Sequence, residues 1–302
     1  MKQHTHCIAM LRPASFGFNE QTANNNHFQN AAYQNASLQQ HALFEFDQMV
    51  ALLRSHGVDV LVLNDDTETA RPDAVFLNNW FCCRQEIVHL FPMWAPNRRA
   101  EKRKELVQAL TQKTGINTII DWSHFESEGL FLEGTGSMVI DHLFKNAFAC
   151  ISERTSLPLF EKYCREYQLY PIAFTASDEL GNAIYHTNVM MAIGEKVAIV
   201  CLAAITDDIN KLTIVHELQS TGRQIVDISL EQMKCFAGNM LELINDSGER
   251  LMLMSKTAYN SLLPHQIALI EQYNKIISPN ICHIEKAGGG SVRCMAAELF
   301  YG

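Results

Sequence analysis

The sequence predicts a mixed α/β fold in which five similar units form a closed ring. A single polar residue interrupts an apolar, strand-like stretch at five places, and successive interruptions are 53 to 55 residues apart. The five residues are Asn79, Glu133, His186, Asn239 and Cys294. A buried polar atom without a partner costs of order 1–3 kcal/mol. A regular series of such residues therefore indicates a repeated unit that points functional groups at one shared centre.

A helix-like segment with one apolar stripe precedes each polar position. In the first segment, residues 38–55, the stripe consists of Leu43, Phe46, Val50 and Leu53. The other four segments are residues 97–114, 156–168, 207–220 and 264–277. Counted from the end of each segment, or from the glycine that terminates three of them, 17 to 22 residues remain before the polar position. This length fits one strand and then a second strand that bears the polar residue.

Short apolar runs supply the remaining strands. Residues 146–151 and 196–200 follow their polar positions as NAFACI and KVAIV. Residues 7–11, CIAML, have no helix before them, and we expect this strand to complete the last unit and join the two ends of the chain. Five ββαβ-type units of this length suit a radially repeating α/β ring. No Pro- or Gly-rich linker interrupts the chain, so we expect one domain over residues 1–302.

A glycine-rich nucleotide loop is the main competing interpretation. Residues 133–140, EGTGSMVI, resemble such a loop, which would favour a doubly wound sheet. However, Val139 occupies the third glycine position, and we expect a strand rather than a helix to follow. We therefore reject a nucleotide site here.

Composition and charge argue against several classes of partner. A net charge of −9 does not suit a nucleic-acid surface. No apolar run reaches the roughly 18 residues of a membrane helix, and we find no resemblance to a signal peptide. The nine cysteines, none in a CxxC pair, indicate reduced thiols in a cytoplasmic compartment. His4, His6 and Cys7 look like part of a metal cluster, but no second ligand pair follows at useful spacing, so we expect no metal.

Cys294 is the candidate nucleophile. It follows the turn formed by residues 288–291, GGGS, where backbone N–H groups can approach a substrate closely. A thiol with a pKa near 8.5 becomes a good nucleophile only when positive charge or desolvation tunes it. By residue type alone Cys294 would be one more buried cysteine, and its position in the repeat is what favours a catalytic role.

His186, Asn188 and Glu133 are the candidate partners of the thiol. In a strand His186 and Asn188 would point to the same face, which suits proton transfer to a leaving nitrogen together with a hydrogen bond that orients the substrate. A carboxylate from Glu133 at the same centre would hold a protonated group or position water. A core histidine and a turn glutamate are the structural alternatives.

Three further polar residues have two interpretations each. We favour a substrate contact for Asn79 and a turn for Asn239, because asparagine tolerates left-handed backbone conformations. Arg12, at the end of the first strand, could bind a substrate carboxylate through its planar guanidinium. A surface salt bridge is the equal alternative for Arg12.

With these residues assembled, the chain resembles the amidinotransferase/pentein superfamily of enzymes that modify guanidino groups. The resemblance runs nearly end to end and is closest to the citrulline-utilisation hydrolases. The motifs that carry it are MLRPASF, PDAVFLNNW, FLEGTGSMVID, HTNVMMAIG, FAGNMLEL and GGGSVRCMAAELF. The resemblance implies a five-bladed α/β propeller that requires no metal or organic cofactor. It also implies that Cys294 attacks a planar carbon, His186 transfers protons and Glu133 holds the substrate or the histidine.

One departure from the superfamily bears on the substrate. Branches that act on arginine and dimethylarginine typically carry carboxylates for the guanidinium, whereas Asn79 and Asn188 stand at the matching positions here. An amide offers a donor and an acceptor without charge, which suits a neutral ureido group. A desolvated guanidinium without its carboxylates would be penalised by several kcal/mol. We therefore expect hydrolysis of citrulline to ornithine, CO2 and ammonia, with Arg12 as the candidate for the α-carboxylate.

Three alternatives stay open. The runner-up is an arginine or dimethylarginine deiminase or dihydrolase, in which Glu133 alone balances the guanidinium. An amidinotransferase would differ only in admitting an amine instead of water. A non-catalytic binding protein on the same propeller is disfavoured by the presence of Cys294, His186 and Glu133 together. The expected partner is a small amino acid, and a homodimer is one option for the assembly.

Overall fold

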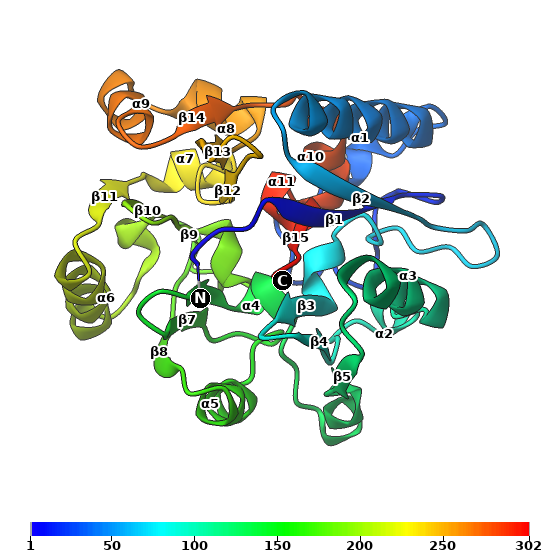
Figure 1. The fold of residues 1–302 in the computed structure, drawn as a ribbon, viewed down its shortest axis with the longest axis horizontal. Coiled ribbons are helices and arrows are strands. Elements are labelled where there is room, and N and C mark those ends of the chain that lie inside the picture. The colour runs from blue at the N-terminus through cyan, green and yellow to red at the C-terminus, as the bar shows by residue number, and fades with distance from the viewer. Residues whose placement is uncertain (1, 302) are drawn as a thin grey trace.

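Five three-stranded sheets surround a common centre in the computed structural model, which describes residues 2–301 (Figure 1). In every sheet the middle strand pairs antiparallel with one neighbour and parallel with the other. In sheet order the strands are β15 (Ala297–Glu298), β1 (Cys7–Arg12) and β2 (Asp59–Asn64); β3 (Phe81–Arg84), β4 (Ile87–Leu90) and β5 (Thr118–Asp121); β6 (Val139–Asp141), β7 (Asn146–Cys150) and β8 (Tyr170–Phe174); β9 (Met191–Ile193), β10 (Val197–Val200) and β11 (Gln224–Asp227); and β12 (Leu241–Ile244), β13 (Arg250–Leu253) and β14 (Lys275–Ile277).

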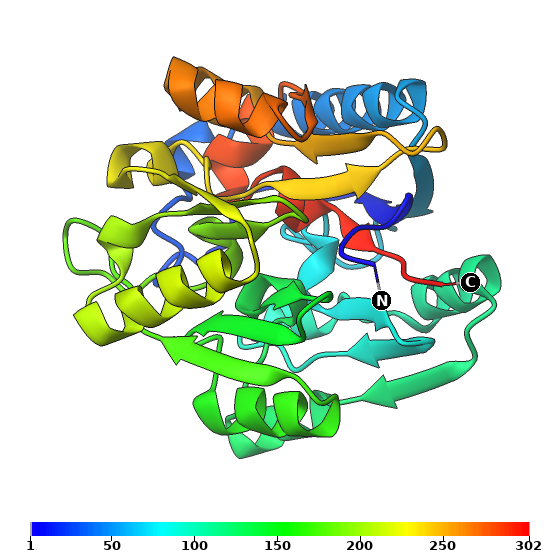
Figure 2. The same ribbon diagram turned by 60° about the vertical axis from the view of Figure 1, so that its left-hand side comes forward.

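Helices connect the two parallel strands of each sheet, because a parallel pair needs a crossover. The crossover helices are α1 (Leu38–Ser55), α2 (Pro96–Arg99) with α3 (Lys104–Thr114), α5 (Leu157–Glu166), α6 (Asp208–Ser220), and α8 (Lys256–Ser261) with α9 (Pro264–Glu271). They lie around the periphery, with α1 and α5 at opposite edges in both views (Figures 1 and 2). None of the helices in the described part of the chain is both long and apolar enough to cross a membrane.

The predicted helix over residues 38–55 is confirmed as α1, and the predicted strand at residues 7–11 is confirmed as β1, which joins the C-terminal β15 to β2. Two helix predictions were partly wrong. The segment 97–114 is divided between α2 and α3. The segment 264–277 ends its helix at Glu271, and its last residues form β14, because a short apolar run fits a buried strand as well as a helix.

The five polar positions recur once per sheet, as the period predicts, but each precedes the first strand of its sheet instead of lying within a strand. They occupy short turns: Asn79 in η2 (Leu77–Asn79), Glu133 before α4 (Gly134–Ser137), His186 before η4 (Thr187–Val189), Asn239 before β12, and Cys294 in α11 (Val292–Met295). The strand expected directly after Glu133 is therefore a helix. The remaining short helices are η1 (Ala31–Tyr33), η3 (Ser123–Glu128), η5 (Leu202–Ala204), α7 (Leu230–Lys234) and α10 (Cys282–Gly288).

Contacts between neighbouring sheets position these turns. One buried cluster spans three sheets and contains Phe148 of β7, Met190 directly before β9, and Met252 of β13. Truncation of such a side chain to alanine costs about 2–5 kcal/mol, so the inner turns are held on a rigid support. At the join between the chain ends, the backbone N–H of Leu299 donates to the carbonyl of Cys7 at 3.0 Å.

Candidate active site

The Cys294 thiol lies at the centre, among amides from two other units. Its Sγ is 3.3 Å from Nδ2 of Asn239 and 3.5 Å from Nδ2 of Asn188, and the side chain is 4% exposed. Burial raises the pKa of Cys294, while the Ser291 backbone and the two amides oppose that shift. The resting thiol is therefore protonated near neutral pH, but the two amide donors can stabilise it once it ionises.

His186 and Glu133 form a buried pair next to this group. His186 Nε2 lies 2.8 Å from Glu133 Oε2, and Glu133 Oε1 accepts a hydrogen bond from the backbone N–H of Trp94 at 2.9 Å. Burial would raise the pKa of Glu133, but the hydrogen bond from His186 and the charge of Arg154 lower it to about 2. Burial lowers the pKa of His186 to about 4, although Glu133 opposes this. A carboxylate thus holds a neutral imidazole, which is the form able to accept a proton.

Gly136 links Asn79 to this pair. A Cβ at Gly136 would lie 2.4 Å from Asn79 Nδ2 and 2.8 Å from His186 Nδ1, so only glycine allows the amide and the imidazole to approach α4 this closely. Asn79 Oδ1 accepts a hydrogen bond from Arg98 Nη1 at 2.7 Å, and its Nδ2 donates to Asn78 at 3.0 Å.

The Asn188 amide at the centre has one hydrogen-bonding atom that a ligand could use. Its Oδ1 is buried and has no hydrogen-bond partner within residues 2–301, although its Nδ2 faces the Cys294 sulfur. An unpaired buried acceptor costs about 1–3 kcal/mol. An N–H group of a bound molecule, placed beside the sulfur, would remove that cost.

The structure brings five of the six predicted site residues together. Asn188, two residues after His186, contacts Cys294, and His186 contacts Glu133, while Asn79 packs against Gly136. No hydrogen bond joins Cys294 and His186 directly among the contacts of these two described residues.

Arg12 is not part of this group. Its guanidinium makes two hydrogen bonds of 2.8 Å to Asp47, and its side chain is 39% exposed. Arg12 therefore forms the surface salt bridge that was the alternative to a contact with a substrate carboxylate. Asn239, expected to be only a turn residue, instead donates to both the Asn188 carbonyl and the Cys294 sulfur.

Two buried arginines near the centre were not predicted from the sequence. Arg98, in the segment 97–114 predicted as a helix, is 2% exposed and is held by two hydrogen bonds to Glu101 at 2.8 and 2.9 Å. Arg154 lies 4.6 Å above the Tyr185 ring, and its Nη1 is 3.8 Å from Glu133. Charged residues in a polar stretch look solvated in a sequence, so no local signal could have located either of them.

The segment between β1 and α1 lies against the same region. Thr22 donates to Asp73 at 3.1 Å, its carbonyl accepts from Arg154 at 3.2 Å, and Asn26 donates to the carbonyl of Gly288 at 3.2 Å. These contacts come from three separate units, so the segment covers the ends of several turns at once.

The metal-like group at the N-terminus does not converge. His4 Nδ1 lies 3.2 Å from Glu242 instead, and the one cluster of three metal-ligating side chains in residues 2–301 is elsewhere, at Glu45, Cys282 and His283.

The centre contains a thiol, an imidazole paired with a carboxylate, and several amides. This combination of groups is suited to nucleophilic attack on a planar carbon.

Comparison with known proteins finds similarity over nearly the whole chain. Residues 12–301 match the family model described as N,N dimethylarginine dimethylhydrolase, eukaryotic. No protein with curated annotation matches the chain.

Solved structures share the fold at low sequence identity. ArgZ, an arginine dihydrolase from the ornithine–ammonia cycle in cyanobacteria, gives a TM-score of 0.73 at 17% identity over 98% of this chain, which spans only 41% of the ArgZ chain. The substrate-bound N-terminal domain of ArgZ is covered to 98%, with the same TM-score and identity. A dimethylarginine dimethylaminohydrolase adduct gives a TM-score of 0.64 at 16% identity, over 97% of this chain and 98% of that one.

Proposed function

Since the chain belongs to the N,N dimethylarginine dimethylhydrolase family, eukaryotic type, we propose that it is a thiolate hydrolase of the side chain of an arginine-like amino acid, with citrulline as the preferred substrate. The enzyme class, a hydrolase of carbon–nitrogen bonds other than peptide bonds, follows from the family. The observation that carries the finer proposal is the Cys294 sulfur between the Asn188 and Asn239 amides, with Asn188 linked along the chain to the His186–Glu133 pair.

The proposed reaction uses these groups in sequence. Cys294 gives its thiol proton to His186 and attacks the ureido carbon, and the carbon–nitrogen bond breaks as His186 delivers that proton to the departing amine of ornithine. Water, which His186 deprotonates, then attacks the carbamoyl thioester. The carbon–sulfur bond breaks, His186 returns the proton to the Cys294 sulfur, and the carbamate released breaks down to CO2 and ammonia. Glu133 orients the imidazole and stabilises its cationic form.

The amides support a neutral substrate. In the part of the chain that the structure describes, Asn188 Oδ1 has no hydrogen-bond partner, and it can accept an N–H of the ureido group beside the sulfur. Asn79 and Asn188 carry no charge to balance a guanidinium.

One observation keeps arginine as a second candidate. Asp73 is 2% exposed, and among the described residues its Oδ1 has no hydrogen-bond partner, so a second carboxylate besides Glu133 could receive a guanidinium. The similarity to ArgZ, which is an arginine dihydrolase, supports the same alternative. A dihydrolase would release ornithine from arginine as well.

For the α-carboxylate we propose Arg154 in place of Arg12. Arg98 is already neutralised by Glu101 through two hydrogen bonds. By contrast, Arg154 donates to the Thr22 carbonyl and the Asn25 amide, and its nearest carboxylate oxygen, on Glu133, is 3.8 Å away. Its guanidinium therefore has the capacity to bind a substrate carboxylate.

Two further proposals concern the closure of the fold and the cellular location of the protein. We propose that the five sheets are the blades of one closed propeller in a single domain. This is supported by Ile244 of β12, whose N–H donates to the Thr5 carbonyl at 3.1 Å, while the Thr5 hydroxyl donates to the Leu299 carbonyl at 2.8 Å. The nine unpaired cysteines support a cytoplasmic location.

A substrate panel tests the proposed function. Purified protein would be incubated with arginine, citrulline, dimethylarginine, agmatine and succinylarginine, and ammonia and amine products would be measured. We expect ornithine and ammonia from citrulline. Release of citrulline from arginine, without any ornithine from citrulline, would overturn the citrulline proposal and leave a deiminase.

A further inference from the structure

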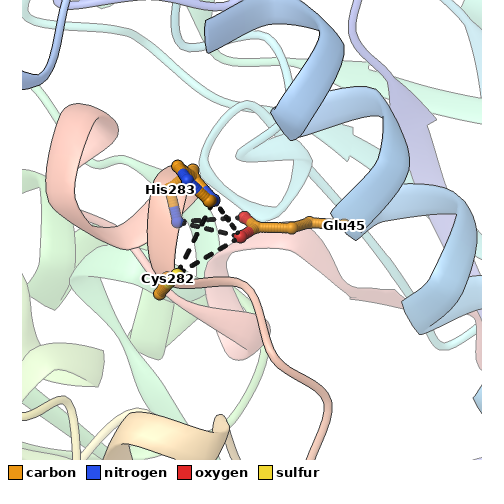
Figure 3. Close-up of side chains that lie close together, drawn as sticks. All are labelled: Glu45, Cys282 and His283. Carbon is orange, nitrogen blue, oxygen red and sulfur yellow. Dashed lines mark hydrogen bonds and ion pairs between the residues drawn. The ribbon is translucent and has the colours of Figure 1, made fainter.

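A cluster of three metal-ligating side chains lies outside the central site, where α1 meets α10 (Figure 3). Glu45 projects from α1 toward the first two residues of α10, Cys282 and His283 (Figure 3). One ligand atom from each residue lies within 4.8 Å of the other two. We propose that these residues form a binding site for a zinc ion.

Two of the three distances between the ligand atoms agree with a tetrahedral zinc site. Zinc bonds of about 2.3 Å to sulfur and about 2.0 Å to nitrogen or oxygen, at tetrahedral angles, separate sulfur from either atom by about 3.5 Å. The Cys282 sulfur lies 3.6 Å from His283 Nδ1 and 3.5 Å from Glu45 Oε1.

The third distance, from His283 Nδ1 to Glu45 Oε1, is shorter because these two atoms form a hydrogen bond of 2.6 Å. A zinc ion would hold these two atoms about 3.3 Å apart. The His283 side chain is 40% exposed, so the imidazole can rotate outward by the required amount without disturbing the core.

His41 is the candidate for a fourth ligand. His41 precedes Glu45 by four residues on α1 and therefore lies on the same face of the helix, one turn away. Its ring centroid is 4.3 Å from that of His283. Together the four residues supply one thiolate, two imidazoles and one carboxylate, a set that favours zinc over calcium or magnesium.

The charge at the cluster also favours a cation. Glu45 is 5% exposed, and within residues 2–301 its only ion-pair partner is His283. Its oxygens accept the backbone N–H groups of His283 and Ile284, each at 3.0 Å. A buried carboxylate without a lysine or arginine is costly, and a divalent ion would balance it.

The site is open to solvent on one side. A cavity of about 430 Å³ adjoins it, lined by His41, Phe44, Glu45, Gln48 and His283 among others. Zinc at this place would tie α1 to α10, which is followed within a few residues by Ser291 and the turn that carries Cys294.

Metal binding to the full-length protein tests the proposal without reference to activity. Chelator-treated protein would be dialysed against zinc chloride or cobalt chloride, and bound metal would be measured by mass spectrometry together with the thiolate-to-cobalt absorption band. The measurement would be made on the Cys294→Ala variant, so that the central thiol contributes nothing. We expect about one ion per chain.

The decisive comparison is between two cysteines. Cys282→Ala removes the thiol but leaves the Glu45 contacts with the α10 backbone, so the fold is kept, which circular dichroism checks. Affinity should fall at least about tenfold in Cys282→Ala and in His283→Ala, and should be unchanged in Cys235→Ala, a matched half-buried cysteine. Absence of stoichiometric metal, or equal affinity in Cys282→Ala and Cys235→Ala, would overturn the site.

Discussion

His186 Nε2 lies 2.8 Å from Glu133 Oε2, although the two residues are 53 positions apart and belong to the turns before two different sheets. Both side chains are almost completely buried. The contact fixes which ring nitrogen faces the carboxylate, and it leaves Nδ1 on the side of Gly136 and Asn79. Replacement of the carboxylate should therefore affect proton transfer more than folding.

Glu133→Gln should lower kcat by about 10²–10⁴-fold. The amide keeps the shape of the side chain but removes the anion that stabilises protonated His186. Glu126→Gln is the matched control, because Glu126 is also ion-paired, with Lys102, but lies outside the centre. Steady-state release of ornithine and ammonia measures the effect. A kcat of Glu133→Gln within a few-fold of wild type would show that the pair is structural.

Alkylation of Cys294 by iodoacetamide should be slow at neutral pH and should accelerate as pH rises. Burial raises the pKa of this thiol above that of an ordinary cysteine. The thiolate fraction therefore still increases at pH values above the pKa of an ordinary cysteine. Fast labelling at neutral pH, the usual mark of an activated cysteine, is thus not expected for the free enzyme. Peptide mass spectrometry gives the rate for each cysteine.

Two features sharpen this labelling experiment. Burial raises the pKa of Cys82 and Cys150 to about 12, so both serve as internal slow controls. Asn239→Ala removes a donor to the sulfur and should move the Cys294 profile to higher pH, while substrate should protect the thiol. A rate that is already constant between pH 7 and 8 would contradict the raised pKa.

Asn188→Asp should shift substrate preference from citrulline toward arginine. The new carboxylate would place a charge next to the sulfur and could pair with a guanidinium, which a neutral amide cannot do. We expect the ratio of kcat/KM for arginine to that for citrulline to rise by about tenfold or more, equivalent to about 1.4 kcal/mol, and further when Asn79→Asp is added. An unchanged ratio in the double variant would show that these amides do not select the substrate.

Arg154→Gln should raise KM by about tenfold or more, since a hydrogen bond to a charged group contributes about 1.5–3 kcal/mol. Arg12→Gln should leave KM nearly unchanged, because Arg12 forms an exposed salt bridge with Asp47, and such a pair contributes little free energy. N-carbamoylputrescine, which is citrulline without the carboxylate, supplies the control: its KM should be insensitive to Arg154→Gln, whereas kcat for both compounds can fall because the charge next to Glu133 is lost. A larger effect of Arg12→Gln than of Arg154→Gln would restore the original assignment of the carboxylate site.

The period of the polar residues was sufficient to predict five units and most of the centre. Cys294, His186, Glu133, Asn79 and Asn239 lie in equivalent turns because each unit repeats the same path of the chain, and Asn188 shares the turn of His186. The type of element was not predictable, since three or four helical residues between apolar strands leave no periodicity to detect.

Contacts between distant parts of the chain account for the other omissions. Arg154 and Glu133 approach each other from a polar loop and a glycine-rich turn, and Glu45 is 237 residues from Cys282. Neither relationship has a sequence spacing that distinguishes it from a solvated charge. Asn239 likewise looked like a turn residue because it follows Gly238, and only the fold directs its amide to the sulfur.

The most direct test of the central claim is the turnover of citrulline and arginine by Cys294→Ala, with Cys235→Ala as the matched cysteine control. A nucleophile that forms a covalent intermediate should be indispensable, so we predict a loss of kcat of roughly 10⁴-fold or more for Cys294→Ala, with ornithine release by Cys235→Ala close to wild type. Cys294→Ala protein that keeps its fold and still releases ornithine within tenfold of the wild-type rate would contradict catalysis by this thiol.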